Sequence, residues 1–400
     1  MIRRAVILLT LIAGLLAAAG GLADTATPSR ATYAKLIDVQ ELWSKDKYDE
    51  AFSVLEELAN KTRDKEPLDY AVAEQYVAHT AILADRYELA RPALEKALAQ
   101  TGLPKEFAAG LKLDYGQIVL GDEEYELARK MLEDWYADTD AEKQPSQLFA
   151  LAYANYMTEH LPRAEELLES ALATSKTVNN TWYRVYYQVL FDQKKYDKAE
   201  SVVYGLVSRE PANETYWQLL VNHYLHLEDD RRALAAMAIA RIQGLMNTTD
   251  DLKRIAMLYS VVEIPERAAR LLQGWVEEGS LKADAETLRR IGDLWLLARD
   301  RDQAKVYLGK AAAAAPNGKT YELLASIDFE DEDWRSAYSN FMQALDAGGL
   351  DDREYAYLLA GISAMRAGMD SQARAALEKA KTSKTYRDQA LAMLRKLNES

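Results

Sequence analysis

One short pattern recurs about every 36 residues and limits the possible folds more than any other feature of this 400-residue chain. Each copy has an alanine with an apolar residue four positions after it, and in the clearest copies an aromatic residue three positions before it, as in Tyr48, Ala51 and Leu55. Neighbouring copies are 33 to 39 residues apart, a period typical of repeat architectures. The ten alanines are Ala51, Ala90, Ala128, Ala164, Ala199, Ala233, Ala268, Ala304, Ala337 and Ala373.

Two further positions of the repeat agree with this period. Twelve residues before the alanine, seven of the ten copies have glycine or alanine, and seven residues after it six copies have alanine again. Small residues at fixed positions let two helices approach closely, while large residues three or four positions apart fill the space between neighbours. The pattern therefore predicts an all-α chain of helix–turn–helix repeats that share their core with their neighbours.

This pattern resembles the tetratricopeptide repeat (TPR), a helix–turn–helix of about 34 residues. The resemblance implies an α-solenoid, a right-handed superhelix of about ten TPR-like units, over residues 33–385, followed by a capping helix and tail over residues 386–400. The wide spacings of 39 and 38 residues predict longer loops in the first repeats. The first-helix pattern of the family is matched by Trp217, Leu220, Val221 and Tyr224, and its helix-ending proline by Pro211 and Pro316.

The N-terminus has the pattern of a secretory signal peptide over residues 1–23. Arg3 and Arg4 form a basic start, an uncharged apolar run follows, and small residues lead up to Asp24. We therefore expect cleavage before Asp24 and a mature chain in the periplasm. The alternative is an uncleaved segment that anchors the chain to the inner membrane.

The rest of the chain offers no second membrane segment. Residues 24–32 form a short predicted linker, and no later stretch is apolar for long enough to cross a bilayer. We expect no membrane insertion of the mature chain. Lys and Arg total 49 against 63 Asp and Glu, a formal net charge of −14, which also argues against nucleic-acid binding.

No catalytic motif is found in the sequence. The chain has no cysteine, which excludes disulfides, thiol nucleophiles and cysteine-ligated metals. It also lacks a phosphate-binding glycine loop, a GxSxG elbow and an HExxH motif. His223 and His226 have a spacing that could hold a metal, but we interpret them as core or groove histidines. We predict no enzyme activity, no cofactor and no metal.

The TPR resemblance also implies where a partner would bind. In that family the second, fifth, ninth and twelfth residues of a repeat, with the alanine as the twentieth, project into a concave groove. In repeats four to eight these positions mix aromatic residues, amides and charges, which suits an extended peptide or protein partner. The candidate partner-binding residues are Phe149, Tyr153, Tyr156, Arg184, Gln188, Phe191, Gln218, Asn222, Lys253, Met257, Arg289 and Asp293.

A finer resemblance concerns the biological role. The export signal, the cysteine-free run of divergent repeats and the opening stretch around Trp43 and Tyr48 are similar to exported repeat proteins that accompany TonB–ExbB–ExbD systems of Gram-negative bacteria. This implies a periplasmic protein–protein interaction scaffold, accessory to TonB-dependent energy transduction and transport, with inner-membrane TonB, ExbB or ExbD components as partners. The alternative is a scaffold for envelope assembly or polysaccharide export. A peptidoglycan-acting enzyme is disfavoured, because the repeats leave no room for a catalytic domain.

Overall fold

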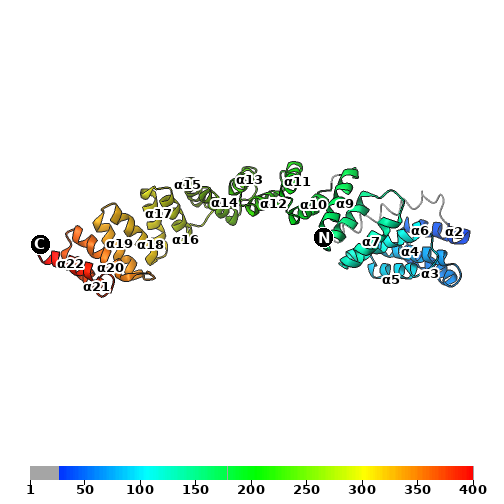
Figure 1. Cartoon of the computed structure of the whole chain (residues 1–400), viewed down its shortest axis with the longest axis horizontal. Helices are drawn as coiled ribbons and strands as arrows, with labels where there is room; N and C mark the ends of the chain where they lie inside the picture. Colours follow the sequence, from blue (N-terminus) through cyan, green and yellow to red (C-terminus); the bar gives the residue numbers. More distant parts are fainter. Residues whose placement is uncertain (1–26, 178, 400) are drawn as a thin grey trace. The chain divides into compact units, whose positions relative to one another are not determined.

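The structure, a computed structural model, describes residues 27–177 and 179–399, which form 21 α-helices and no strand (Figure 1). The predicted signal peptide, residues 1–23, lies outside the described residues. Within the described ranges, no helix combines the length and the apolar composition that crossing a membrane requires.

The helices form two compact units that divide between Arg209 and Glu210. The first unit contains α2 (Arg30–Trp43), α3 (Tyr48–Thr62), α4 (Pro67–Leu83), α5 (Tyr87–Leu98), α6 (Lys105–Gly121), α7 (Tyr125–Asp138), α8 (Pro145–Met157), α9 (Leu161–Thr174), α10 (Asn180–Asp192) and α11 (Tyr196–Arg209). The second unit contains α12 (Glu214–His226), α13 (Asp230–Ile242), α14 (Thr249–Val261), α15 (Pro265–Glu277), α16 (Ala285–Leu297), α17 (Arg301–Ala314), α18 (Gly318–Glu330), α19 (Trp334–Ala347), α20 (Arg353–Arg366), α21 (Asp370–Ala380) and α22 (Arg387–Glu399).

Consecutive helices pair into ten hairpins, from α2–α3 to α20–α21, and α22 packs on the last one. Within each unit, the second helix of a hairpin contacts the first helix of the next, as α3 contacts α4. First helices of successive hairpins also contact each other, as in α6–α8 and α8–α10. These contacts between neighbours confirm the predicted α-solenoid of TPR-like units.

The repeated alanine fixes the position of every second helix. In all ten hairpins this helix begins three residues before the alanine, and all ten alanines have no exposed surface. The apolar residue four positions later is buried as well, from Leu55 in the first hairpin to Leu377 in the last. The pattern found in the sequence is therefore the contact between the helices.

The small residue twelve positions before the alanine sets how closely the two helices of a hairpin approach. A Cβ atom added at Gly361 would lie 2.6 Å from Leu377 Cγ, which is well inside van der Waals contact. The first helix therefore passes directly over the leucine of the second helix at these glycines. The equivalent pairs are Gly292–Leu308 at 2.7 Å and Gly116–Leu132 at 2.8 Å.

The same tight turn joins the two helices of every hairpin. The residue five positions before the alanine has φ between 54° and 71° in all ten hairpins. The next N–H then bonds the carbonyl five residues back, as Lys47 N bonds Leu42 O at 3.0 Å, which closes the first helix. Nine of these left-handed residues are not glycine, namely Asp46, Asp85, Glu123, Glu159, Lys194, Glu228, Glu263, Arg299 and Glu332, and the tenth is Gly368.

The first repeats differ from the sequence expectation. Their extra residues were expected in loops, which is wrong, because α4 and α6 have 17 residues each whereas α8 has 13. The extra residues lengthen the first helices instead. At the N-terminus, α2 starts at Arg30 with Ser29 as its cap, so the end of the predicted linker 24–32 is helical. At the C-terminus, α22 buries Ala390 and Leu394 against the last hairpin.

Candidate functional site

The predicted binding residues lie on the first helices of five hairpins. We call the surface formed by the first helices within either compact unit the first-helix face of that unit. Six of the twelve residues lie on α8 and α10 in the first compact unit, and six lie on α12, α14 and α16 in the second. Each group is described by itself.

The first group contains one residue that is not exposed. Phe149 keeps only 2% of its surface, because its ring stacks on Trp182 of α10 with centroids 4.9 Å apart and planes 11° apart. The expectation that Phe149 projects into an open groove is therefore wrong, and Phe149 instead fixes α8 against α10. Tyr153 is half-buried and stacks on Phe149 at 6.2 Å. Tyr153 thus contributes to packing as well as to the surface.

The C-terminal ends of α8 and α10 are linked by Asp192. Tyr156 donates its hydroxyl to Asp192 Oδ2 at 3.2 Å, and Gln188 donates to Asp192 Oδ1 at 2.8 Å. Burial, together with the nearby Asp192 carboxylate, raises the pKa of Tyr156 to about 12. Phe191 packs between the rings of Tyr187 and Tyr196. These four contacts hold the aromatic side chains together at the C-terminal ends of α8 and α10.

Arg184 is the exposed cation of this group. It lies on α10, two residues after Trp182, and forms no ion pair with any residue that the structure describes. A guanidinium has five N–H donors in a planar fork, which suits a carboxylate or backbone carbonyls of a partner. Arg184 therefore combines an exposed position with a charge that no ion pair among the described residues neutralises.

In the second group, several predicted residues join neighbouring first helices. Asn222 of α12 is exposed, and its side-chain oxygen accepts from Arg254 of α14 at 2.7 Å. Arg289 of α16 donates to Asp293 at 2.9 Å and to Thr320 of α18 at 2.9 Å. Asn222, Arg289 and Asp293 therefore already form hydrogen bonds to other residues of the solenoid.

The remaining members of the second group differ in exposure. Gln218 donates to Glu214 one turn earlier at 2.8 Å, and Lys253 is half-buried. Met257 has 42% of its surface exposed. Met257 is thus an open apolar contact on this part of the face.

Sequence reasoning missed a similar polar and aromatic cluster on α2, α4 and α6. Trp43 stacks on Tyr76 at 5.2 Å and donates its indole N–H to Thr80 at 3.0 Å. Further along the face, Asp114 lies 2.9 Å from His79 Nε2. These partners are 33 to 37 residues apart, which is close to the repeat period, so pairs at that offset are the signal that could have found them.

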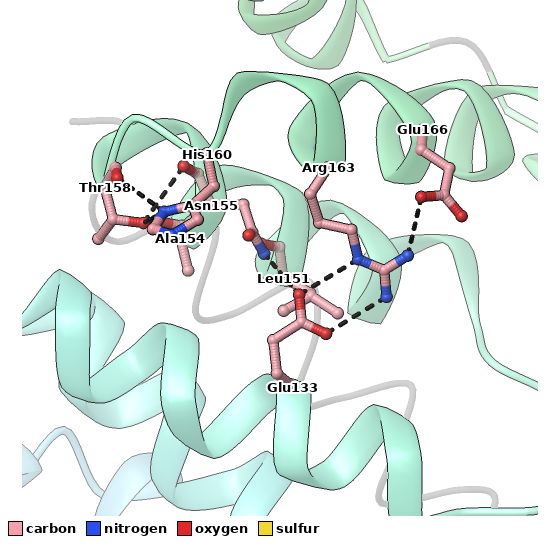
Figure 2. Close-up of polar contacts among 8 residues, drawn as sticks. All are labelled: Glu133, Leu151, Ala154, Asn155, Thr158, His160, Arg163 and Glu166. Atoms are coloured by element: carbon pink, nitrogen blue, oxygen red, sulfur yellow. Dashed lines mark hydrogen bonds and ion pairs between the residues drawn. The ribbon is translucent and has the colours of Figure 1, made fainter.

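A partly buried polar network links α7, α8 and α9 (Figure 2). Asn155 is 1% exposed and donates to Glu133 Oε1 at 3.0 Å, and Arg163 binds both oxygens of Glu133 at 3.2 Å. Although burial opposes the charged form, the hydrogen bonds that Arg163 donates to the carboxylates of Glu133 and Glu166 raise the pKa of Arg163. Each member is satisfied by the others, so we assign the network to fixing the register of these helices rather than to chemistry.

The histidine pair noted in the sequence is divided between core and surface. His223 is fully buried on α12, whereas His226 is exposed near the end of the same helix. Among residues 27–177 and 179–399, no group of three His, Asp or Glu side chains is placed to hold a metal ion.

Comparison with known proteins gives structural similarity without sequence similarity. No protein-family model matches the chain, and no curated protein matches it in sequence. Solved structures similar to it include YrrB, described as a TPR protein with an unusual peptide-binding site (18% identity, 46% of this chain and 90% of YrrB covered, TM-score 0.39). The C-terminal part of a TPR repeat-containing protein from Cytophaga hutchinsonii matches at 14% identity over 70% of this chain and 94% of that one, TM-score 0.39. The TPR2AB domain of yeast Sti1, solved as a pHSP90 complex, matches at 15% identity over 64% and 98%, TM-score 0.35. At these TM-scores the fold assignment depends on the helix pairing described above.

Proposed function

We propose that this chain is a non-enzymatic scaffold in the periplasm that binds protein partners through its first-helix face. The observation that carries the proposal is Arg184, an exposed cation on the first helix α10 with no ion pair among the described residues. The partly exposed rings of Tyr153 and Trp182 supply contact area, and the guanidinium supplies directional hydrogen bonds. This combination is typical of the residues that contribute most to protein interfaces.

The periplasmic part of the proposal depends on the N-terminal sequence. The basic start, apolar run and small residues of residues 1–23 support export, and we propose the chain as an accessory of TonB-dependent transport with TonB, ExbB or ExbD as partners. Cell fractionation tests the location: the chain should be released with periplasmic markers on spheroplasting, with Asp24 as its N-terminal residue. Retention in the cytoplasmic fraction contradicts export.

The binding role is tested with one substitution and a matched control. Arg184→Ala should leave the melting temperature unchanged, because Arg184 is exposed and unpaired, yet reduce the recovery of a cross-linked partner several-fold. The control is Arg267→Ala, which removes an exposed arginine from the second helix α15. Recovery of the inner-membrane transducer components should fall for Arg184→Ala alone. Equal recovery with both variants refutes binding at this face, and failure of the unmodified chain to recover any transducer component refutes the TonB assignment.

A further inference from the structure

The first helices α8 and α10 of the first compact unit carry many aromatic residues and almost no charge. α8 has no charged residue and α10 has only Arg184 and Asp192, although 28% of the whole chain is charged. Four rings follow one another across the two helices, with successive centroids 4.9, 6.2 and 6.5 Å apart. We call them the aromatic row, and in order they are Trp182, Phe149, Tyr153 and Tyr156.

Two members of the aromatic row combine a partly exposed ring with a hydrogen-bond donor. The indole N–H of Trp182 and the hydroxyl of Tyr153 form no hydrogen bond with any residue that the structure describes. Burial, together with the charge of Glu123, raises the pKa of Tyr153, so this hydroxyl keeps its proton and remains a donor. With the guanidinium of Arg184, three side chains of this surface therefore offer donors to a ligand.

Acceptors are scarcer than donors on the same surface. Asp192, the one carboxylate of the two helices, already accepts hydrogen bonds from Tyr156 at 3.2 Å and from Gln188 at 2.8 Å. A ligand that brings N–H groups of its own would find few partners here, and a donor that is buried without a partner weakens binding. A ligand that offers acceptors and no donors suits this surface best.

The charges near the aromatic row select among such ligands. A carboxylate segment would meet the negative charges of Asp192 and Glu123, against the single positive charge of Arg184. A peptide carbonyl accepts from the same donors and carries no net charge. Proline has a carbonyl and no N–H, and proline-rich segments form the polyproline II helix, which has no internal hydrogen bonds and binds aromatic-lined surfaces.

We propose that the aromatic row binds a proline-rich segment of a partner protein in the polyproline II conformation. The proline rings pack on the partly exposed rings of Trp182 and Tyr153, and the carbonyls of the segment accept hydrogen bonds from these two side chains and from Arg184. The proposal rests on the proposed function, since it names the kind of segment that binds the same first-helix face.

Two conservative variants separate the donors from the packing. Tyr153→Phe removes the hydroxyl and keeps the ring that stacks on Phe149, and Trp182→Phe removes the indole N–H and keeps an aromatic ring at that position. The matched control is Tyr321→Phe, which removes the hydroxyl of a partly exposed tyrosine on the first helix α18 of the second unit. Circular dichroism should show the helical content of the unmodified chain in all three variants.

The experiment measures binding of fluorescent twelve-residue peptides by anisotropy with the full-length protein. The proline peptide repeats Ala-Pro-Pro, the glycine peptide has glycine in place of every proline, and the acidic peptide is the glycine peptide with aspartate in place of every alanine. The unmodified chain should bind the proline peptide at least about tenfold more tightly than either of the others. Tyr153→Phe and Trp182→Phe should each weaken this binding several-fold, and Tyr321→Phe should leave it unchanged.

Three results overturn the proposal. The first is equal binding of the proline and glycine peptides, and the second is tighter binding of the acidic peptide than of the proline peptide. The third is an equal effect of Tyr153→Phe and Tyr321→Phe on the proline peptide. Each of these results leaves the Arg184→Ala recovery experiment free to succeed with a segment of another kind. Failure of that recovery experiment beside the expected proline-peptide results refutes the proposed cellular partner alone.

Discussion

Gly292→Ala should destabilise the α16–α17 hairpin, although the same change inside an ordinary helix stabilises it by about 1 kcal/mol. The new Cβ would lie 2.7 Å from Leu308 Cγ and 3.2 Å from the backbone nitrogen of Leu308. Carbon atoms prefer about 3.5–4.0 Å, so the helices must separate or Leu308 must leave its position. Overpacking of this kind costs about 1–3 kcal/mol, so we expect a net loss of about 1 kcal/mol.

The control for this prediction lies on the partner helix. A Cβ at Gly309 of α17 would have nothing within 4 Å, so Gly309→Ala should stabilise the same hairpin. Hydrogen exchange of the α16–α17 amides reports the local free energy of opening, which suits a repeat array whose global unfolding need not be two-state. In a Leu308→Ala background, Gly292→Ala should lose its penalty. Equal stabilisation by Gly292→Ala and Gly309→Ala refutes the close-contact reasoning.

Two further changes test the core and the charge network. Ala233→Trp should lower the free energy of unfolding by about 1–3 kcal/mol or more in urea denaturation, because Ala233 is fully buried, whereas Ala235→Trp on the exposed side of α13 should not. Although burial opposes ionisation, hydrogen bonds from Lys195 and Lys198 hold the pKa of Glu165 below its usual value. The ionised Glu165 side chain therefore stabilises the fold at pH values above its usual pKa, and this stabilisation is lost as the pH falls through the depressed pKa. The free energies of unfolding at pH 7 and pH 3 should therefore differ less in Glu165→Gln than in the unmodified chain. An identical pH dependence of the two proteins contradicts the assignment.

The sequence predicted the core well, because the core of a solenoid is local. Ala128 and Leu132 are four residues apart, and Gly116, which meets Leu132, lies on the preceding helix of the same hairpin. The periodic pattern therefore records the contacts directly. The placement of the longer first repeats failed, since a spacing of 39 residues does not say whether extra residues extend α4 or its loop.

The binding surface was predicted less well, because it depends on neighbours one repeat away. The position rule placed Phe149 in an open groove, but Trp182 of the next first helix covers it.

The left-handed turns have a consequence for how the stability of this chain can be adjusted. A residue other than glycine in this left-handed conformation destabilises the fold by on the order of 1 kcal/mol. Nine of the ten turns have such a residue. The turns are about one repeat apart, so changes at different turns should add. The stability of each hairpin is therefore adjustable at its own turn.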